Sequence, residues 1–227
     1  MRKWVSVILL GFVAAGFFIV LSDIPFGDNR MDVAKYYIDN GITETGAVNI
    51  VTAVVVNYRA LDTLGEVTVL FVASLGLGVL LYAGKDGSGN KQRASLVVRT
   101  GSRILFPLIL LFGAYIFVHG HLTPGGGFQG GAVIASAFLL QYLAYRSYRI
   151  DRQKFSMVES ISGSVFVVVG LLGLAIGGYF LSNFLDKGVP YSLFSAGVIP
   201  VLYVAIGLKV GAELAGIVAG LMESGRG

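Results

Sequence analysis

Apolar runs of transmembrane length alternate with short polar segments along the whole chain. About 20 apolar residues are needed to cross the hydrocarbon core of a bilayer. Four runs are long enough, at residues 4–21, 64–83, 161–181 and 193–221. Two shorter runs, at residues 104–118 and 131–145, become long enough when each gains a turn from its flanks. The pattern predicts an all-α integral membrane protein, a bundle of about six transmembrane helices.

The first run also raises the question of a signal peptide, because Arg2 and Lys3 precede it. The run is long, however, and no small-residue cleavage pattern follows it. We therefore expect a retained helix.

Positive charges are divided unevenly between the two sides that six alternating spans define. One side receives Arg2, Lys3, Lys85, Lys91, Arg93, Arg99, Arg103, Arg146, Arg149, Arg152, Lys154 and Arg226. The other side receives Arg30, Lys35, Arg59 and Lys187, and Lys209 lies within a span. Because cytoplasmic loops carry the excess of Lys and Arg, the first side and both termini are predicted to be cytoplasmic.

Composition excludes several classes of protein. With 55% hydrophobic and only 13% charged residues, the chain is too apolar for an ordinary water-soluble domain. It has no cysteine, so iron–sulfur ligation, thiol catalysis and disulfides are excluded and no cofactor is expected in this chain. Its basic residues form short membrane-flanking groups instead of one patch, which argues against nucleic-acid binding.

A polar, turn-forming segment at residues 84–93 predicts a junction between two modules. Residues 1–95 would hold two spans and a long external segment, and residues 96–227 would hold four spans. Within the external segment, residues 31–40 are compatible with a short surface helix. Residues 48–58 are β-branched and too short to cross, so we expect a re-entrant or partner-covered segment there.

Two pairs of ionisable residues are spaced four apart, which places each pair on one helix face. Asp62 and Glu66 open the second span, where they would either attract a cation or simply complement the positive end of the helix. Lys209 and Glu213 lie well inside the last span, where ionisable side chains are expensive and tend to face a cavity or partner. That pair would either fix packing or form a protonatable step.

Two histidines and a glycine-rich loop follow the third span. His119 and His121 can exchange protons near neutral pH, but no Cys or carboxylate cluster completes a metal ligand set, so no metal is expected. The loop contains Pro124, Gly125, Gly126, Gly127, Gly130 and Gly131 and lacks the Gly-Lys-Ser/Thr ending of a P-loop. Its backbone would either contact an ion or pack tightly.

The segment from His119 to Gly131, HGHLTPGGGFQGG, resembles the signature of the B subunit of Mrp-type sodium/proton antiporters, and the resemblance covers residues 97–222. Residues 58–66 resemble the C-terminal region of the Mrp A subunit, although Asn57 and Ala60 depart from its pattern, which puts cation binding at Asn57 in doubt. A related small subunit occurs in archaeal membrane-bound hydrogenases.

The resemblance implies a non-catalytic subunit of an Mrp-type module that moves sodium in a respiratory sulfane sulfur reductase or hydrogenase. Its partners would be other membrane subunits, lipid and, indirectly, peripheral iron–sulfur subunits.

Three hypotheses follow. In the first, a polar ion path uses Asp62, Glu66, His119, His121, Lys209 and Glu213. In the second, the chain is a structural adaptor whose glycine-rich helices join neighbouring subunits. In the third, it is a stand-alone transporter, although no inverted repeat supports this. Residues 146–164 are expected at the cytoplasmic surface, where basic side chains meet lipid headgroups.

Overall fold

Helices make up the secondary structure of the described residues, which are 2–22, 31–83 and 94–224 of a computed structural model, with no strand among them. Within this part of the chain six helices are long and apolar enough to cross a membrane. They are α1 (Arg2–Ser22), α4 (Ala60–Ala83), α5 (Leu96–Val118), α6 (Gly127–Ala144), α7 (Arg152–Gly177) and α8 (Ile199–Ser224). The predicted all-α fold with six spans is confirmed, whereas the junction predicted at residues 84–93 lies outside the described residues.

The chain divides into two compact units, Met1–Lys35 and Tyr36–Gly227. In the first unit, α1 exposes apolar side chains along its length, with Phe12 at 80% and Phe18 at 76% exposure. A helix that is apolar all round needs a lipid or protein environment. The predicted membrane span therefore fits this helix.

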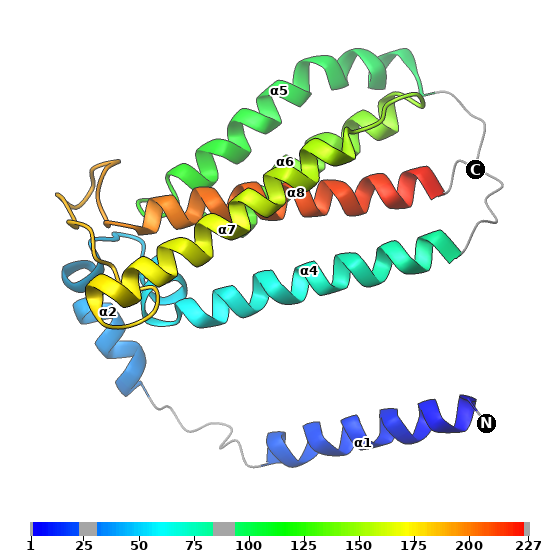
Figure 1. The fold of residues 1–227 in the computed structure, drawn as a ribbon. Coiled ribbons are helices and arrows are strands. Elements are labelled where there is room, and N and C mark those ends of the chain that lie inside the picture. Colours follow the sequence, from blue (N-terminus) through cyan, green and yellow to red (C-terminus); the bar gives the residue numbers. More distant parts are fainter. Residues whose placement is uncertain (1, 23–30, 84–93, 225–227) are drawn as a thin grey trace. The chain divides into compact units, whose positions relative to one another are not determined.

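Helix α8 is the central element of the second unit. α4, α6 and α7 each pack against it, and α5 packs mainly on α6 (Figure 1). Its core-facing side chains Ile199, Leu202, Ile206 and Val210 are at most 2% exposed. Helices α4 and α7 both pack against α8. Within the described residues, the backbones of α4 and α7 do not come close to each other.

Glycines allow α6 to lie very close to its neighbours. A Cβ atom added to Gly131 would stand 2.8 Å from the Cβ of Val210 and 2.9 Å from the carbonyl oxygen of Gly207. A Cβ at Gly130 would stand 2.7 Å from the carbonyl oxygen of Gly113 on α5. Small residues of this kind let helix backbones approach within membranes, where packing drives association.

Helix α7 begins nine residues before the predicted apolar run at residue 161. Asp151 is its N-cap and accepts a hydrogen bond from the backbone N–H of Lys154 at 3.3 Å. This backbone hydrogen bond is the main cause that lowers the pKa of Asp151, and the Lys154 ammonium, 3.2 Å from the same carboxylate, adds to it. The sequence predicts residues 155–164 at the cytoplasmic surface. In the structure they belong to α7, and Phe155, Ser156 and Glu159 line a cavity that α4 and α8 also line.

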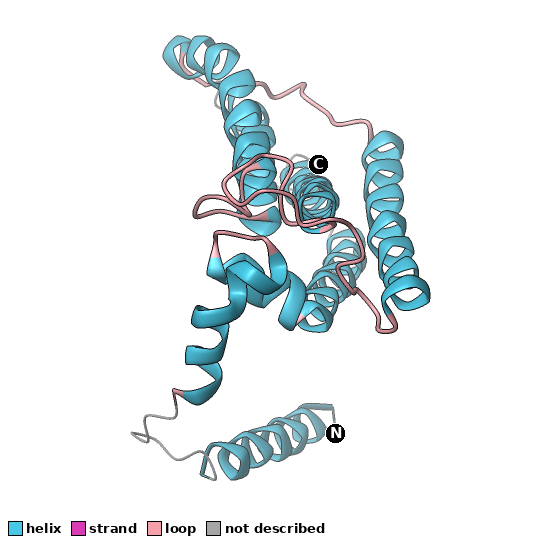
Figure 2. Cartoon of the chain, turned by 90° about the vertical axis from the view of Figure 1, so that its left-hand side faces the viewer, coloured by secondary structure: helices cyan, strands magenta, loops and turns pink. Residues whose placement is uncertain are grey.

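The two ends of this unit are named after a residue in each. The His121 end holds the loop between α5 and α6, the connection between α7 and α8, and the external segment, which folds as α2 (Asp32–Thr45), α3 (Ile50–Thr52) and the π-helical turn η1 (Ala53–Tyr58). Its loops gather in front of the helix ends in Figure 2. The surface helix predicted at residues 31–40 is present and extends to Thr45.

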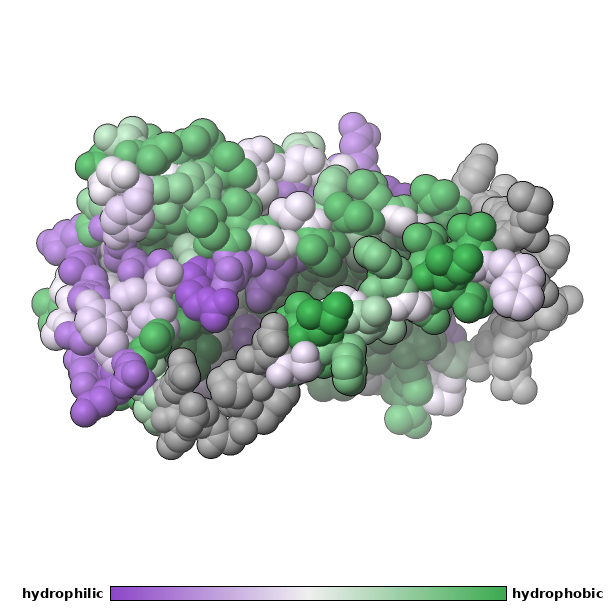
Figure 3. All heavy atoms as spheres, turned by 90° about the horizontal axis from the view of Figure 1, so that it is seen from below, coloured by the Kyte–Doolittle hydropathy of each residue, from purple (hydrophilic) through white to green (hydrophobic). Residues whose placement is uncertain are grey.

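The opposite Glu223 end holds residues 145–151 and the end of α8. There Glu223 accepts a hydrogen bond from Tyr142 at 2.9 Å and pairs with Arg152 at 2.8 Å, which ties α8 to α6 and α7. Between the ends, large apolar side chains face outward. Figure 3 shows hydrophobic colour in several large patches of the one face that it draws. Hydrophilic colour gathers in that figure on the side of α2.

Candidate functional site

A lysine ammonium lies among apolar helices close to the middle of α8. Lys209 is ten residues from the start of this 26-residue helix, or roughly 15 Å along its axis at 1.5 Å per residue. A charged side chain at such a depth costs several kcal/mol unless protein groups or water shelter it. The groups that contact Lys209 therefore determine how its charge is stabilised at this depth.

Two carboxylates provide this shelter. The Lys209 Nζ atom lies 3.3 Å from Glu213 Oε2, one turn further along α8, and 3.7 Å from Glu159 Oε1 on α7. The Glu213 side chain is fully buried, and its second oxygen, Oε1, has no hydrogen-bond partner among the described residues. Two negative charges therefore face one positive charge, and a carboxylate oxygen is left unsatisfied.

An aromatic ring from α4 completes the surroundings of the lysine. Lys209 Nζ lies 5.1 Å from the ring centroid of Phe71, within the range of a cation–π interaction. Gly163 on α7 lies beside the lysine stem, where an added Cβ would meet Lys209 Cδ at 3.7 Å. The lysine thus has contacts on three helices.

Two cavities meet at these residues. A cavity of about 210 Å³, here the Glu213 cavity, extends between α4, α7 and α8 from Glu213 and Glu159 to Arg152 at the Glu223 end. A second of about 530 Å³, the Phe71 cavity, extends from Glu159 and Lys209 toward Leu64 and Thr68, nearer the His121 end. Each has room for several water molecules. Glu159 lines both cavities.

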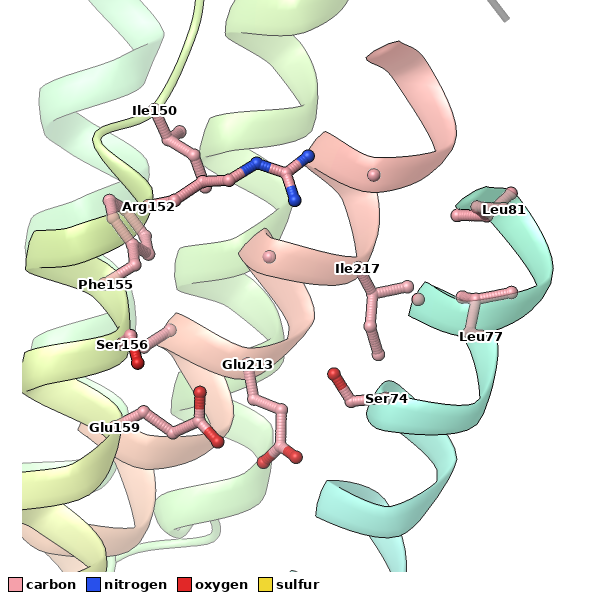
Figure 4. A pocket seen from close by; sticks show the side chains of 14 residues that line it. Ser74, Leu77, Leu81, Ile150, Arg152, Phe155, Ser156, Glu159, Glu213 and Ile217 are labelled. Carbon is pink, nitrogen blue, oxygen red and sulfur yellow. The ribbon is translucent and has the colours of Figure 1, made fainter. Parts of the chain in front are cut away.

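Figure 4 shows how the polar groups lie in the Glu213 cavity. The carboxylates of Glu159 and Glu213 come from α7 and α8, and the Ser74 hydroxyl comes from α4. All three point into the space that the helices enclose. Oxygen atoms of this kind suit a proton or a small hard cation.

Glu159 is not among the residues predicted from the sequence. It lies just outside the apolar run that begins at residue 161, so the hydropathy pattern assigns it to the surface. A signal is present in Asp151, whose capping position places Glu159 two turns inside α7. Its contact with Lys209 depends on how α7 packs against α8.

Asp62 and Glu66 do not join this cluster. Both are exposed on the first turns of α4. Asp62 pairs with Arg59 at 2.5 Å, and Glu66 has no ion pair within the described part of the chain. The structure therefore keeps these two carboxylates on an outer face of the helix.

The two histidines differ in their surroundings. The His119 ring stacks on Tyr115 with centroids 4.2 Å apart, whereas His121 is fully buried. Neither ring nitrogen of His121 has a hydrogen-bond partner of good geometry among the described residues. Burial lowers the pKa of His121, and the nearby backbone of Ser192 and Leu193 offsets this only in part.

The glycine-rich loop is fixed by the external segment. Asn49 donates to the carbonyl oxygens of Gly120 and Thr123 at 2.8 and 2.9 Å, and Thr52 donates to Gly120 at 2.6 Å. Tyr203 of α8 donates to the Thr52 hydroxyl at 2.9 Å. Gly126 has φ +152°, and a Cβ there would meet the Gln129 amide oxygen at 2.7 Å.

Of the two roles considered for this loop, these contacts favour tight packing. Pro124 is exposed, while Gly127, Gly130 and Gly131 are buried at the start of α6. Among the described residues no three His, Cys, Asp or Glu side chains lie close enough together to hold a metal ion.

Comparison with known proteins identifies the family. A family model described as a domain related to the MnhB subunit of Na+/H+ antiporters matches residues 97–216, just over half of the 227 residues. The chain belongs to this family. The resemblance of residues 119–131 to the Mrp B subunit is therefore confirmed, and a second family model, that of the MbhE component of MBH, matches residues 2–86. Together with the six apolar helices, membership in this family identifies a multi-pass membrane protein.

Two solved structures and one further relative are similar over nearly the whole chain. A chain of the membrane-bound sulfane sulfur reductase, an archaeal respiratory membrane complex, is 51% identical, with TM-score 0.76 and coverage of 98% of this chain and 99% of that one. A chain of the Mrp complex from Dietzia sp. DQ12-45-1b is 29% identical, with TM-score 0.72 and coverage of 97% and 26%. An uncharacterized protein of Methanocaldococcus jannaschii is 32% identical over 231 residues, or 89% of this chain and 87% of that protein.

Proposed function

We propose that this chain is a non-catalytic membrane subunit of an Mrp-type cation/proton antiporter module within a respiratory membrane complex. In this proposal Lys209, Glu159 and Glu213 form part of a path for sodium. Peripheral iron–sulfur subunits would carry out the redox chemistry, since this chain has no cysteine. Residues 1–95 and 96–227 would be two modules, a division that the family matches at residues 2–86 and 97–216 support.

The observation that carries the proposal is the unpartnered Glu213 Oε1 beside a shared lysine, at mid-membrane depth and next to two cavities. A structural ion pair gains most when every polar atom is satisfied, because a buried unpaired oxygen costs about 1–3 kcal/mol. Retaining such an oxygen toward a cavity suits a site that receives a cation. The similarity to a chain of the sulfane sulfur reductase supports the proposal that this chain works within a respiratory membrane complex.

The test uses the whole complex reconstituted in liposomes, with uptake of radioactive sodium as the measurement. Glu213→Gln keeps the shape of the side chain and removes its charge, so we expect sodium uptake to fall about tenfold or more, since tenfold corresponds to about 1.4 kcal/mol in a barrier. Asp39→Asn, on the exposed face of α2, is the matched control and should leave uptake unchanged.

Glu66→Gln tests the acid pair predicted at the start of α4. If the complex assembles normally and uptake is unchanged in both Glu66→Gln and Glu213→Gln, the path does not exist and the adaptor hypothesis is left. A Lys209→Met/Glu213→Gln double variant separates the two further. It removes one charge of each sign but leaves Glu159 without its ammonium, so assembly is measured beside uptake. In a complex that assembles normally, an adaptor should support normal transport, whereas an ion path should lose transport.

The stand-alone hypothesis has its own test. The purified chain, reconstituted without partners, should give no sodium uptake above that of empty liposomes. Uptake by the chain alone would contradict the proposal that it acts within a complex.

A further inference from the structure

Lys209 occupies the position where the two cavities meet. Glu213 lines the Glu213 cavity, Lys209 lines the Phe71 cavity, and Glu159 lines both. Glu159 is the residue that the two cavities share, so a cation that moves between them along their common lining passes its carboxylate. The Lys209 ammonium, 3.7 Å from Glu159 Oε1, stands at this crossing.

The charge of the cluster leaves room for one further cation. Two carboxylates and one ammonium sum to a formal charge of minus one, and the other charged side chain that lines these cavities, Arg152, pairs with Glu223 at the Glu223 end. An ammonium that satisfies both carboxylates competes directly with an incoming monovalent cation for the same oxygens. A cation can bind well only when the ammonium withdraws from at least one of them.

The structure offers the lysine a place to withdraw to. Phe71 already lies within cation–π range, with its ring centroid 5.1 Å from Nζ, so a small movement onto the ring face would keep the ammonium stabilised after it leaves its carboxylates. Gly163 on α7 leaves space beside the lysine stem, because an added Cβ there would stand 3.7 Å from Cδ and 3.8 Å from Cε. Three resting positions, two carboxylates and one ring, thus lie within reach of one flexible side chain.

We propose that Lys209 is a tethered internal cation that closes the passage between the two cavities, and that a monovalent cation crosses at Glu159 only while the Lys209 ammonium rests on Phe71. This inference depends on the proposed ion path. It adds a gate and assigns a positioning role to Phe71, which carries no charge of its own.

The proposed gate can be tested by measuring how the rate of transport depends on sodium concentration. Lys209→Met retains the unbranched stem and removes the ammonium, so sodium no longer has a competitor. If the lysine occupies the carboxylates about nine-tenths of the time, its removal lowers the apparent KM for sodium about tenfold. The maximal rate falls as well, because the ion is then held too firmly. Glu213→Gln has the opposite effect on KM and raises it.

A milder variant tests the resting place. Phe71→Leu should lower the maximal rate of sodium uptake about threefold at an unchanged level of assembled complex, which is the size expected for a lost cation–π contact. Phe112→Leu is the matched control, since Phe112 is an exposed aromatic residue on α5. It should leave the rate unchanged.

Each outcome supports or overturns one claim. If Glu213→Gln leaves uptake unchanged, the gate fails, and the ion path fails with it when Glu66→Gln leaves uptake unchanged as well. If Glu213→Gln abolishes uptake while assembled Lys209→Met complex shows the wild-type KM for sodium, the path stands and the gate is wrong. Should Lys209→Met prevent assembly, Phe71→Leu decides alone, and a rate equal to that of Phe112→Leu overturns the gate.

Discussion

Lys209, Glu159 and Glu213 lie inside the bundle, and each acid stands within 3.7 Å of the lysine ammonium, a group of opposite formal charge. Removing one partner from a buried pair typically costs about 3–5 kcal/mol, since the other charge is left uncompensated. Variants at Lys209 therefore affect stability as well as transport, and assembly must be measured beside every flux. Exposed pairs such as Arg59 and Asp62 contribute far less.

His121 gives a prediction for pH dependence at the same scale. Its pKa is lowered in the folded chain, chiefly by burial, while an unfolded histidine takes up a proton near pH 6.5. The stability that this burial contributes is present above about pH 6.5 and is lost as the pH falls through the folded-state pKa. We expect the thermal unfolding midpoint of the complex to drop between pH 7.5 and pH 5.

His121→Phe should reduce that drop because phenylalanine does not titrate. His119→Phe serves as the comparison. The His119 ring is half-buried against Tyr115 and is the smallest cause acting on the pKa of His121, so this variant should change the drop much less. Equal loss of stability in wild type and His121→Phe would contradict the assignment.

At the scale of helices, the glycine-rich segment acts through packing. Gly130 and Gly131 bring α6 against α5 and α8, and Asn49 and Thr52 hold the preceding loop by hydrogen bonds. These hydrogen bonds connect the glycine-rich loop to the external segment, and the external segment to α8. α8 carries both Tyr203, which bonds Thr52, and the Lys209–Glu213 pair.

Gly131→Ala tests this arrangement. The added methyl would stand 2.8 to 2.9 Å from atoms of Val210, Gly207 and Gly211, two of them backbone atoms, so α6 and α8 must separate. Overpacking of this kind costs about 1–3 kcal/mol. A lower thermal unfolding midpoint is expected, whereas Gly101→Ala, with nothing within 4 Å, should have the wild-type value or a slightly higher one. Unchanged stability in Gly131→Ala would show that the helices tolerate the separation.

For the whole molecule, the large apolar surface of α4 and α5 requires lipid or partner subunits around the bundle. The excess of Lys and Arg at the Glu223 end predicts that this end faces the cytoplasm. This orientation places the Glu213 cavity on the cytoplasmic side and the Phe71 cavity nearer the outside.

The absence of cysteine allows a direct test of orientation. Single cysteines at Ser147, between α6 and α7, and at Ser192, between α7 and α8, both replace exposed residues. A maleimide that does not cross membranes should label Ser192→Cys in intact cells and Ser147→Cys only after the cells are opened. The reverse pattern would invert the predicted topology.

The sequence by itself determined the six spans and the spacing of Lys209 and Glu213, because both are local properties. A run of apolar residues has transmembrane length whatever its neighbours are, and residues four apart share a helix face. Hydropathy places the start of α7 too late, since it gives no weight to the capping aspartate.

Only the tertiary structure decided which ionisable groups meet. Glu159 and Lys209 are 50 positions apart in the chain, and their contact depends on how α7 and α8 pack. The same packing buries His121 and leaves Asp62 and Glu66 exposed, although all of them are equal candidates in the sequence. The burial of a side chain and the identity of its ion-pair partner depend on how helices pack against one another, so the sequence pattern of a single helix cannot predict them.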